Sequence, residues 1–347
     1  MPNGAVSEDG PLDVAGIGSM VVDRMHRAAR LLGDDGKDFL LPLAGGVLIE
    51  RHVGGVILNH LGWAAALGVR CGVFGRQGDD EDGRFLRAAM DERGIARDLL
   101  LVDEPTSLSE IFVDLAGERA IYMAPGATTA TTPGQVREHH ARFISRARRV
   151  TTEVSQLPLA AALEALQIAG RAGAETWVDL DVPPSVALAT LGTVDELDAV
   201  LRAADVLKPS KAALAELLQV DATSDAGELA AAVRERFETP VVVVTDGDRG
   251  CAIHSDPFEG ALAAHPVEAI DTTGAGDAFL GGLLASRTAG LAWDEAGAFA
   301  NAVAAVCVGQ LGAFPLDPLA ARSTALGFYD GPAGPLEALF ARRQTTG

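Results

Sequence analysis

The sequence predicts an α/β protein in which helices cover both faces of a mostly parallel sheet. Between residues 133 and 309, short runs rich in Val, Ile and Leu alternate with longer helical segments, as in sheets built through helical crossovers. A glycine turn, Gly274-Ala275-Gly276, opens one of these helices. Together these features predict a three-layer α/β/α core with a small additional β segment.

Hydrophobic periodicity and the flanking turn residues assign each element. In the first part of the chain, the apolar run 12–17 predicts a strand, and Gly68 is expected to end a helix over 59–67. The other elements expected here are short strands within 37–57, a strand at 69–74, a helix at 85–93 and a hairpin of strands 108–114 and 120–123.

From residue 133 onward the elements alternate. The expected strands are 149–154, 175–180, 205–208, 240–244, 251–254 with a hairpin partner near 261–264, and 266–270. The expected helices are 133–146, 158–172, 194–203, 210–219, 225–237, 277–289 and 294–309.

Composition favours one globular domain over residues 1–347, with a flexible polar lead-in at 1–11. With 48% hydrophobic and 22% charged residues, the chain can bury a large core. Neither an internal repeat nor a low-complexity linker divides it.

The charge and cysteine content exclude several classes of function. A net charge of −20 argues against nucleic-acid binding, which requires clustered Lys and Arg. No apolar run is long enough to span a bilayer, and the polar start is not a signal peptide. Cys71, Cys251 and Cys307 lie far apart in apolar surroundings, which predicts buried free thiols and a cytoplasmic protein.

The run from Asp271 to Asp277 carries the clearest chemical signal. A glycine turn at a helix N-terminus presents backbone N–H groups and the positive end of the helix dipole to an anion. Asp277 follows in the first helical turn, where a carboxylate beside an anion is costly unless it removes a proton from an attacking hydroxyl. Asp is also common at helix N-termini for structural reasons alone.

This run, Asp-Thr-Thr-Gly-Ala-Gly-Asp, resembles the C-terminal signature of the ribokinase-like, PfkB-type carbohydrate kinases. Gly54-Gly55 followed by Asn59, then Leu67-Gly68 and the Gly78–Gly83 segment, resembles the N-terminal signature of the same family. The resemblance covers about residues 12–315 and implies a ribokinase-like core with a β lid. By this resemblance Asp277 is the catalytic base, and the anion hole consists of Gly274, Ala275 and Gly276.

The resemblance also implies a sugar site. It comprises Asp23, Gly54, Gly55, Asn59 and, more weakly supported, Gln156. A carboxylate such as Asp23 can accept hydrogen bonds from two vicinal hydroxyls. From the residues alone, Asn59 could equally cap a helix and Asp23 could be a solvated side chain.

ATP, Mg²⁺ and a homodimer follow from the same resemblance. The implied nucleotide-binding residues are Thr245, Gly247, Ser210 and Asn301, and the implied K⁺ site is formed by Asp271 and Thr273. The lid is expected from segments of about 18–56 and 103–125, and the same segments are expected to pair two subunits.

The middle of the chain departs from the family pattern. Ser210 and Ala213 stand where relatives carry the Asn and Glu of a Lys-Pro-Asn-x-x-Glu motif. We expect this change to weaken metal positioning while leaving the base and the anion hole intact.

The sequence therefore predicts an ATP-dependent kinase that phosphorylates a primary hydroxyl of a small sugar. A nucleoside kinase of the same fold and a non-catalytic regulatory member that binds nucleotide or sugar are the alternatives.

Overall fold

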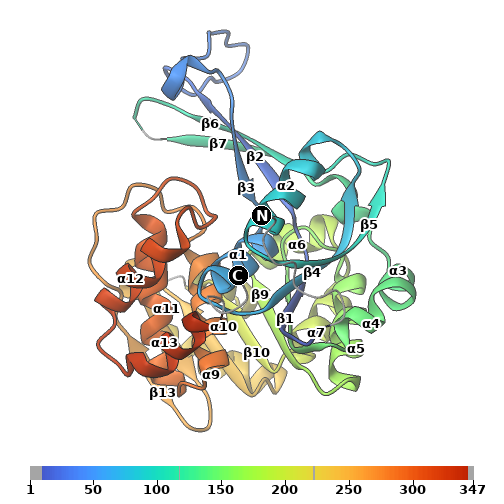
Figure 1. Cartoon of the computed structure of the whole chain (residues 1–347), viewed down its shortest axis with the longest axis vertical. Helices are drawn as coiled ribbons and strands as arrows, with labels where there is room; N and C mark the ends of the chain where they lie inside the picture. Colours follow the sequence, from blue (N-terminus) through green and yellow to red (C-terminus); the bar gives the residue numbers. More distant parts are fainter. Residues whose placement is uncertain (1–9, 117, 222, 343–347) are drawn as a thin grey trace.

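The computed structural model describes residues 10–342 except 117 and 222. Within these residues, nine strands form the core sheet in the order β13-β12-β11-β10-β9-β8-β1-β4-β5 (Figure 1). Their bounds are β1 Leu12–Ile17, β4 Cys71–Gly78, β5 Ala96–Val102, β8 Ala147–Glu153, β9 Glu175–Leu180, β10 Val206–Pro209, β11 Val241–Thr245, β12 Cys251–His254 and β13 Glu259–Leu262.

Most of the core sheet is parallel, as the sequence predicts. Every pairing from β5 to β11 is parallel, and β12 and β13 are added antiparallel at one edge. The carboxyl ends of β1, β8, β9, β10 and β11 therefore meet along one edge of the sheet. Ligands of open α/β sheets bind outside such an edge.

Helices cover both faces of this sheet, and each face has its own apolar core. Along β11, Val241 and Val243 join one hydrophobic cluster while Val242 and Val244 join the other, because successive side chains point to opposite faces. The first cluster includes α1 Val56–Ala66, α2 Glu81–Glu92, α10 Ala275–Ala289, α11 Trp293–Val308, α12 Pro318–Phe328 and α13 Ala333–Ala341. The second includes α5 Leu159–Arg171, α6 Pro184–Thr190, α7 Val194–Arg202, α8 Lys211–Leu218 and α9 Ala226–Phe237.

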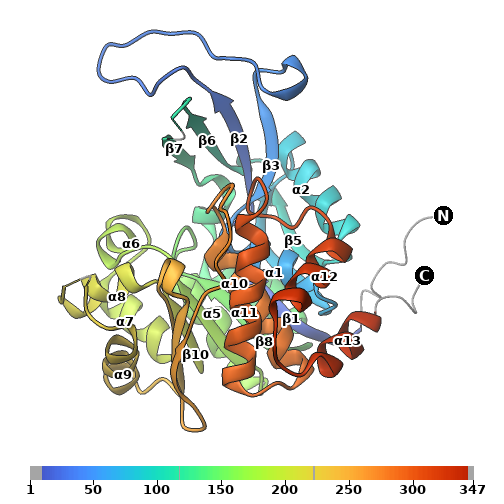
Figure 2. The same ribbon diagram turned by 90° about the vertical axis from the view of Figure 1, so that its left-hand side faces the viewer.

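A separate four-stranded sheet projects from the core and forms the predicted lid (Figures 1 and 2). This lid sheet has the order β3-β2-β6-β7, with bounds β2 Val21–Arg27, β3 Glu50–Gly54, β6 Ser107–Val113 and β7 Arg119–Ala124. The β2 and β6 strands are parallel, and the expected hairpin is confirmed as the antiparallel pair β6 and β7.

Several expected elements are wrong in detail. Residues 266–270 form no strand: Ile270 is largely exposed, and its N–H bonds to Val308 in α11 instead of to a neighbouring strand. Of the short strands expected within 37–57, the only regular one in the described structure is β3. The segment before it is irregular, with positive φ at Gly45 and Gly46.

Two helices also differ from expectation. The helix placed at 59–67 begins three residues earlier at Val56, because Gly55 adopts a φ of 93° and starts it. The helix placed at 133–146 is divided into α3 Pro133–Gln135, a π-helical turn over Val136–His140 and α4 Ala141–Ile144.

The remaining expectations concern the chain end, the thiols and membranes. The lead-in predicted for residues 1–11 lies outside the described residues except for Gly10 and Pro11. Cys71, Cys251 and Cys307 are buried thiols that form no disulfide within the described residues, as predicted. No described helix combines the length and apolar character needed to cross a bilayer.

Candidate active site

The glycine turn at the start of α10 has a conformation that only glycine fits. Gly274 adopts a φ of 75°, and a Cβ atom added there would lie 2.7 Å from the Cα of Ala313. Gly274 offers no side chain to cap the helix, and the N–H of Ala275 donates only a long bond of 3.4 Å to the carbonyl oxygen of Thr272. The turn therefore has the geometry of an anion site at a helix N-terminus.

Asp277 lies in the first turn of α10 and is 8% exposed. Its Oδ2 accepts a hydrogen bond of 2.8 Å from Nδ2 of Asn59, and its Oδ1 lies 3.4 Å from Nε2 of His60. Both donors belong to α1, which packs against α10. The structure thus brings together Asn59 and Asp277, two predicted site residues 218 positions apart.

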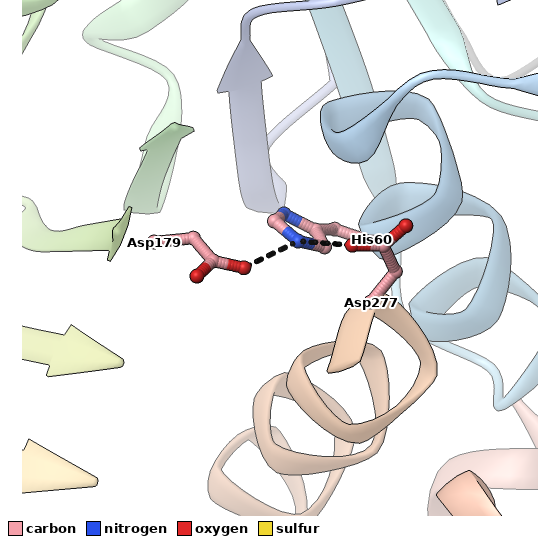
Figure 3. Close-up of side chains that lie close together, drawn as sticks. All are labelled: His60, Asp179 and Asp277. Carbon is pink, nitrogen blue, oxygen red and sulfur yellow. Dashed lines mark hydrogen bonds and ion pairs between the residues drawn. The ribbon is translucent and has the colours of Figure 1, made fainter. Parts of the chain in front are cut away.

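A buried network continues from Asp277 across the carboxyl ends of the strands (Figure 3). Nε2 of His60 also lies 3.1 Å from Oδ2 of Asp179 at the end of β9. The same oxygen accepts a 2.7 Å hydrogen bond from the ammonium group of Lys208 in β10. Burial opposes the charge of His60, but the hydrogen bonds and negative charges of Asp179 and Asp277 outweigh it and raise its pKa to about 9.

Asn59 has capacity for a ligand. Its Nδ2 is used by Asp277, whereas its buried Oδ1 has no hydrogen-bond partner among the described residues. Buried polar atoms are normally paired, so this oxygen is suited to accept a hydrogen bond from a bound hydroxyl.

Asp23 and Gly54 lie against each other in the lid sheet. A Cβ atom on Gly54 would lie 2.1 Å from Oδ2 of Asp23, so glycine leaves room for this carboxylate. Burial raises the pKa of Asp23 to about 6; repulsion from Asp277 and Asp271 adds to the rise, and a hydrogen bond with Ser109 opposes it. Asp23 therefore lies close enough to Asp277 and Asp271 for their charges to act on it.

A cavity of about 280 Å³ lies between the lid sheet and residues 269–273. Asp23, Ile111 and Arg119 line it from the lid. Asn59 and Asp277 are not among its lining residues, so the cavity represents only the lid side of the site.

Arg119, at the start of β7, joins the lid to the loop before α10. Its guanidinium bonds to the side chains of Asp271, Thr272 and Thr273. Asp271 also accepts hydrogen bonds from the backbone N–H groups of Thr273 and Gly312. Burial opposes ionisation of Asp271, but these bonds and Arg119 outweigh it and lower its pKa.

This arrangement does not fit the K⁺ site expected at Asp271 and Thr273. Both side chains are engaged by a guanidinium, and both carboxylate oxygens of Asp271 accept protein hydrogen bonds. A cation at the same place would have to displace Arg119.

Three of the four expected nucleotide residues, Ser210, Thr245 and Gly247, lie at or just after the ends of β10 and β11. Ser210 and Thr245 form a β-bridge with each other, so they are neighbours. Oγ of Ser210 caps α8 by accepting from the N–H of Ala213, and Gly247 adopts a φ of 59° in the turn after β11.

Asn301 lies apart from this pair. Its amide donates to the backbone carbonyls of Leu262 and Ala263, so in the described structure it fastens α11 to the end of β13.

Gln156 and Gly55 are the two remaining residues of the expected sugar site. Gln156 is buried, and its Nε2 lies 3.8 Å from Sδ of Met123 in the lid strand β7. Gly55 begins α1 with a positive φ, and a Cβ atom there would lie 2.5 Å from the carbonyl oxygen of Ser19.

Sequence reasoning missed Glu153, which holds this region together. Its carboxylate accepts hydrogen bonds from the N–H and the hydroxyl of Ser19 and from the N–H of Gln156. Oγ of Ser19 accepts in turn from the N–H of Val56 in α1. The sequence offers little sign of this role, because β8 also carries two arginines and two threonines.

Sequence reasoning also missed His60 and Lys208 as site residues. Each is a polar residue in a mostly apolar segment: His60 follows Asn59 in α1, and Lys208 lies in β10. Such residues are rarely buried without a partner.

Comparisons with known proteins identify the family of this chain. Residues 20–318 match the model of the pfkB family carbohydrate kinases. A fructokinase from Klebsiella pneumoniae is 32% identical over 265 residues, covering 75% of this chain and 84% of the relative. Fructokinase-2 of Oryza sativa subsp. japonica is 30% identical over 313 residues, covering 82% of this chain and 89% of the relative.

Solved structures confirm the ribokinase-like fold. Ribokinase of Arabidopsis thaliana, solved with ribose and ATP, superimposes with a TM-score of 0.76 at 21% identity, covering 91% of this chain and 99% of the other. A putative Ribokinase II from E. coli, solved with ATP and Mg²⁺, gives a TM-score of 0.74 at 21% identity with the same coverage. The chain therefore belongs to the pfkB family of carbohydrate kinases.

Proposed function

We propose that this carbohydrate kinase transfers the γ-phosphoryl group of ATP to a primary hydroxyl of a small sugar. The observation that carries the proposal is the position of Asp277, in the first turn of α10 directly beside the uncapped glycine turn. Relatives named fructokinase and a neighbour solved with ribose and ATP support a ketose or pentose as acceptor.

Asp277 acts as the general base in this proposal. The hydroxyl proton moves to its carboxylate, the hydroxyl oxygen bonds to the γ-phosphorus, and the bond to the β-phosphate breaks to release ADP. The N–H groups of Gly274, Ala275 and Gly276 stabilise the charge on the transferring group. Such preorganised donors act without reorganisation during the reaction.

The acceptor sugar lies between the lid and α1. Asp23 accepts hydrogen bonds from two sugar hydroxyls, and the unpartnered Oδ1 of Asn59 accepts one from a third. Oε1 of Gln156, which also has no partner among the described residues, offers a further acceptor. Gly54 and Gly55 keep the backbone close to the sugar. This set leaves the reacting hydroxyl directed toward Asp277.

ATP occupies the edge formed by the ends of β10 and β11 in our proposal. Ser210, Thr245 and Gly247 approach its phosphates and ribose, and Asn301 shapes the adenine pocket through its backbone contacts. Mg²⁺ is carried on the ATP phosphates. The β10–α8 step does not fit direct coordination, because Ala213 offers no ligand and Ser210 already caps α8.

The lid sheet is also proposed to pair two subunits. Its strand β7 exposes Ile121, Tyr122 and Met123, which are 49%, 68% and 56% exposed. Light scattering would give a dimer mass for the wild type and a monomer mass for Tyr122→Glu.

A panel of acceptors tests the proposed function. ADP release is measured with ATP, Mg²⁺ and D-fructose, D-ribose, D-glucose, adenosine or inosine. The proposal expects turnover with a free sugar and none with Asp277→Asn. Turnover confined to nucleosides would show a nucleoside kinase, and tight ligand binding without any turnover would show a non-catalytic member.

A further inference from the structure

A histidine in α1 lies between the proposed catalytic base and a second aspartate. His60 is 0% exposed, and its Nε2 is 3.4 Å from Oδ1 of Asp277 and 3.1 Å from Oδ2 of Asp179 (Figure 3). Because both neighbours are carboxylate oxygens, Nε2 must carry a proton and act as the donor.

We propose that His60 is a positioning residue that fixes the carboxylate of Asp277 for catalysis. The inference rests on the proposed function, in which Asp277 is the base. We call Asn59 and His60 together the clamp, because each of them contacts one carboxylate oxygen of Asp277.

The clamp holds both oxygens of Asp277 from consecutive residues of one helix. Asn59 donates to Oδ2 at 2.8 Å, and His60 faces Oδ1. The Asn59 hydrogen bond on one oxygen and the His60 ion pair on the other together restrain rotation of the carboxylate, which keeps its remaining lone pairs directed toward the acceptor. A base held in this way needs no reorientation when the hydroxyl arrives.

His60 also separates two like charges. The facing atoms of His60, Asp179 and Asp277 all lie within 4.8 Å of one another, so the two carboxylates would repel directly without the histidine. The ammonium group of Lys208 in β10 offsets the charge of Asp179, but in the described structure it forms no hydrogen bond or ion pair with Asp277. Removal of His60 would therefore push Asp277 away from the position that Asn59 favours.

The same three side chains could in principle coordinate a metal ion. The ammonium group of Lys208 lies 2.7 Å from the oxygen of Asp179 that a metal would use, and a divalent cation beside it would be strongly repelled. We therefore assign the cluster as a hydrogen-bonded clamp, and metal content becomes an outcome of the test.

The experiment compares His60→Leu and His60→Gln with a matched control. His140 is another buried histidine bonded to an aspartate, Asp98, and it packs against Phe74 in the other hydrophobic cluster. The variant His140→Gln therefore reports the general cost of losing a buried His–Asp pair. Steady-state kinetics with ATP, Mg²⁺ and D-fructose or D-ribose give kcat and KM, and circular dichroism checks the fold.

We expect His60→Leu to lower kcat by about 10- to 100-fold while the sugar KM changes by less than about threefold. His60→Gln, which keeps an N–H donor, should recover part of that loss. His140→Gln should keep the wild-type kcat. The double variant His60→Leu/Asp277→Asn should be no slower than Asp277→Asn alone, because His60 acts through Asp277.

Three results would overturn the inference. One is a folded His60→Leu enzyme with kcat within twofold of wild type while Asp277→Asn is inactive, which leaves the proposed function standing. Another is a stoichiometric metal ion that is lost with His60. The third, independent of turnover, is a ¹H–¹⁵N spectrum in which the Nε2–H signal of His60 is absent or unaffected by Asp277→Asn. If His60→Gln and His60→Leu both fail to fold, this spectrum of the wild type and Asp277→Asn decides the question.

Discussion

Replacement of Gly54 by alanine tests the acceptor site through a single methyl group. The added Cβ would lie 2.1 Å from Oδ2 of Asp23, far inside an ordinary contact of at least 3.4 Å. The carboxylate of Asp23 must therefore move by about 1.3 Å. Gly54 does not have a positive φ, so the backbone itself tolerates alanine.

The magnitude follows from the hydrogen bonds that Asp23 would lose. A hydrogen bond to a charged group contributes roughly 1.5–3 kcal/mol, and loss of one such bond lowers kcat/KM by about 10- to 100-fold. We expect the loss mainly as a higher sugar KM, with a melting temperature close to wild type. Gly33→Ala is the matched control, because nothing lies within 4 Å of a Cβ atom there.

A double-mutant cycle tests whether Gly54→Ala acts through the carboxylate of Asp23. In Asp23→Ala the obstructing carboxylate is gone, so adding Gly54→Ala should cause little further loss. Initial rates over a range of sugar concentrations measure all four proteins. An unchanged KM in Gly54→Ala, or fully additive losses in the double variant, would show that Asp23 does not bind the sugar.

Three further predictions concern the α10 turn, the buried glutamate and the lid. Gly274→Ala should abolish most activity and lower the melting temperature, because its Cβ would lie 2.7 Å from the Cα of Ala313 and its φ is positive. Wild-type turnover in this variant would contradict the role of the glycine turn as the anion site. Burial raises the pKa of Glu153 to about 7, so its protonated form favours the folded state. That stability is fully present below about pH 4.5 and is lost as pH rises toward 7, by up to about 3 kcal/mol. Urea titrations of Glu153→Gln should show a smaller loss over this range, and equal losses would refute the assignment. Because Arg119 bonds to the side chains of Asp271 and Thr273, wild-type kcat should be the same in K⁺ and tetramethylammonium salts. The variant Arg119→Ala should become K⁺-stimulated. Strong K⁺ dependence of the wild-type enzyme would contradict this role of Arg119.

The sequence predicted the core sheet well because its signals are local. The valines at 241–244 and the turn after them mark a buried strand without reference to the rest of the chain. The Gly274–Asp277 turn was equally readable, since the glycines and the aspartate are adjacent. The strand expected at 266–270 was wrong because alternation alone does not supply a pairing partner.

The catalytic clamp could not be predicted, because it is made by tertiary contacts. His60, Asp179 and Lys208 come from α1, β9 and β10, and nothing in their local sequence pairs them. The offset of Asn59 also depends on Gly55, whose positive φ starts α1 early and places Asn59 within the helix. Only the packing of α1 on α10 brings this side chain to Asp277.

Phosphoryl transfer by Asp277→Asn under single-turnover conditions tests most directly whether Asp277 is the catalytic base. Asparagine preserves the shape of the side chain and removes its ability to accept the hydroxyl proton. We predict that the rate of phosphoryl transfer to the sugar falls by at least about 10²-fold in this variant. Its affinities for sugar and ATP, measured by calorimetry, should stay within a few fold of wild type. Transfer at the wild-type rate with intact binding would contradict the role of Asp277 as the base.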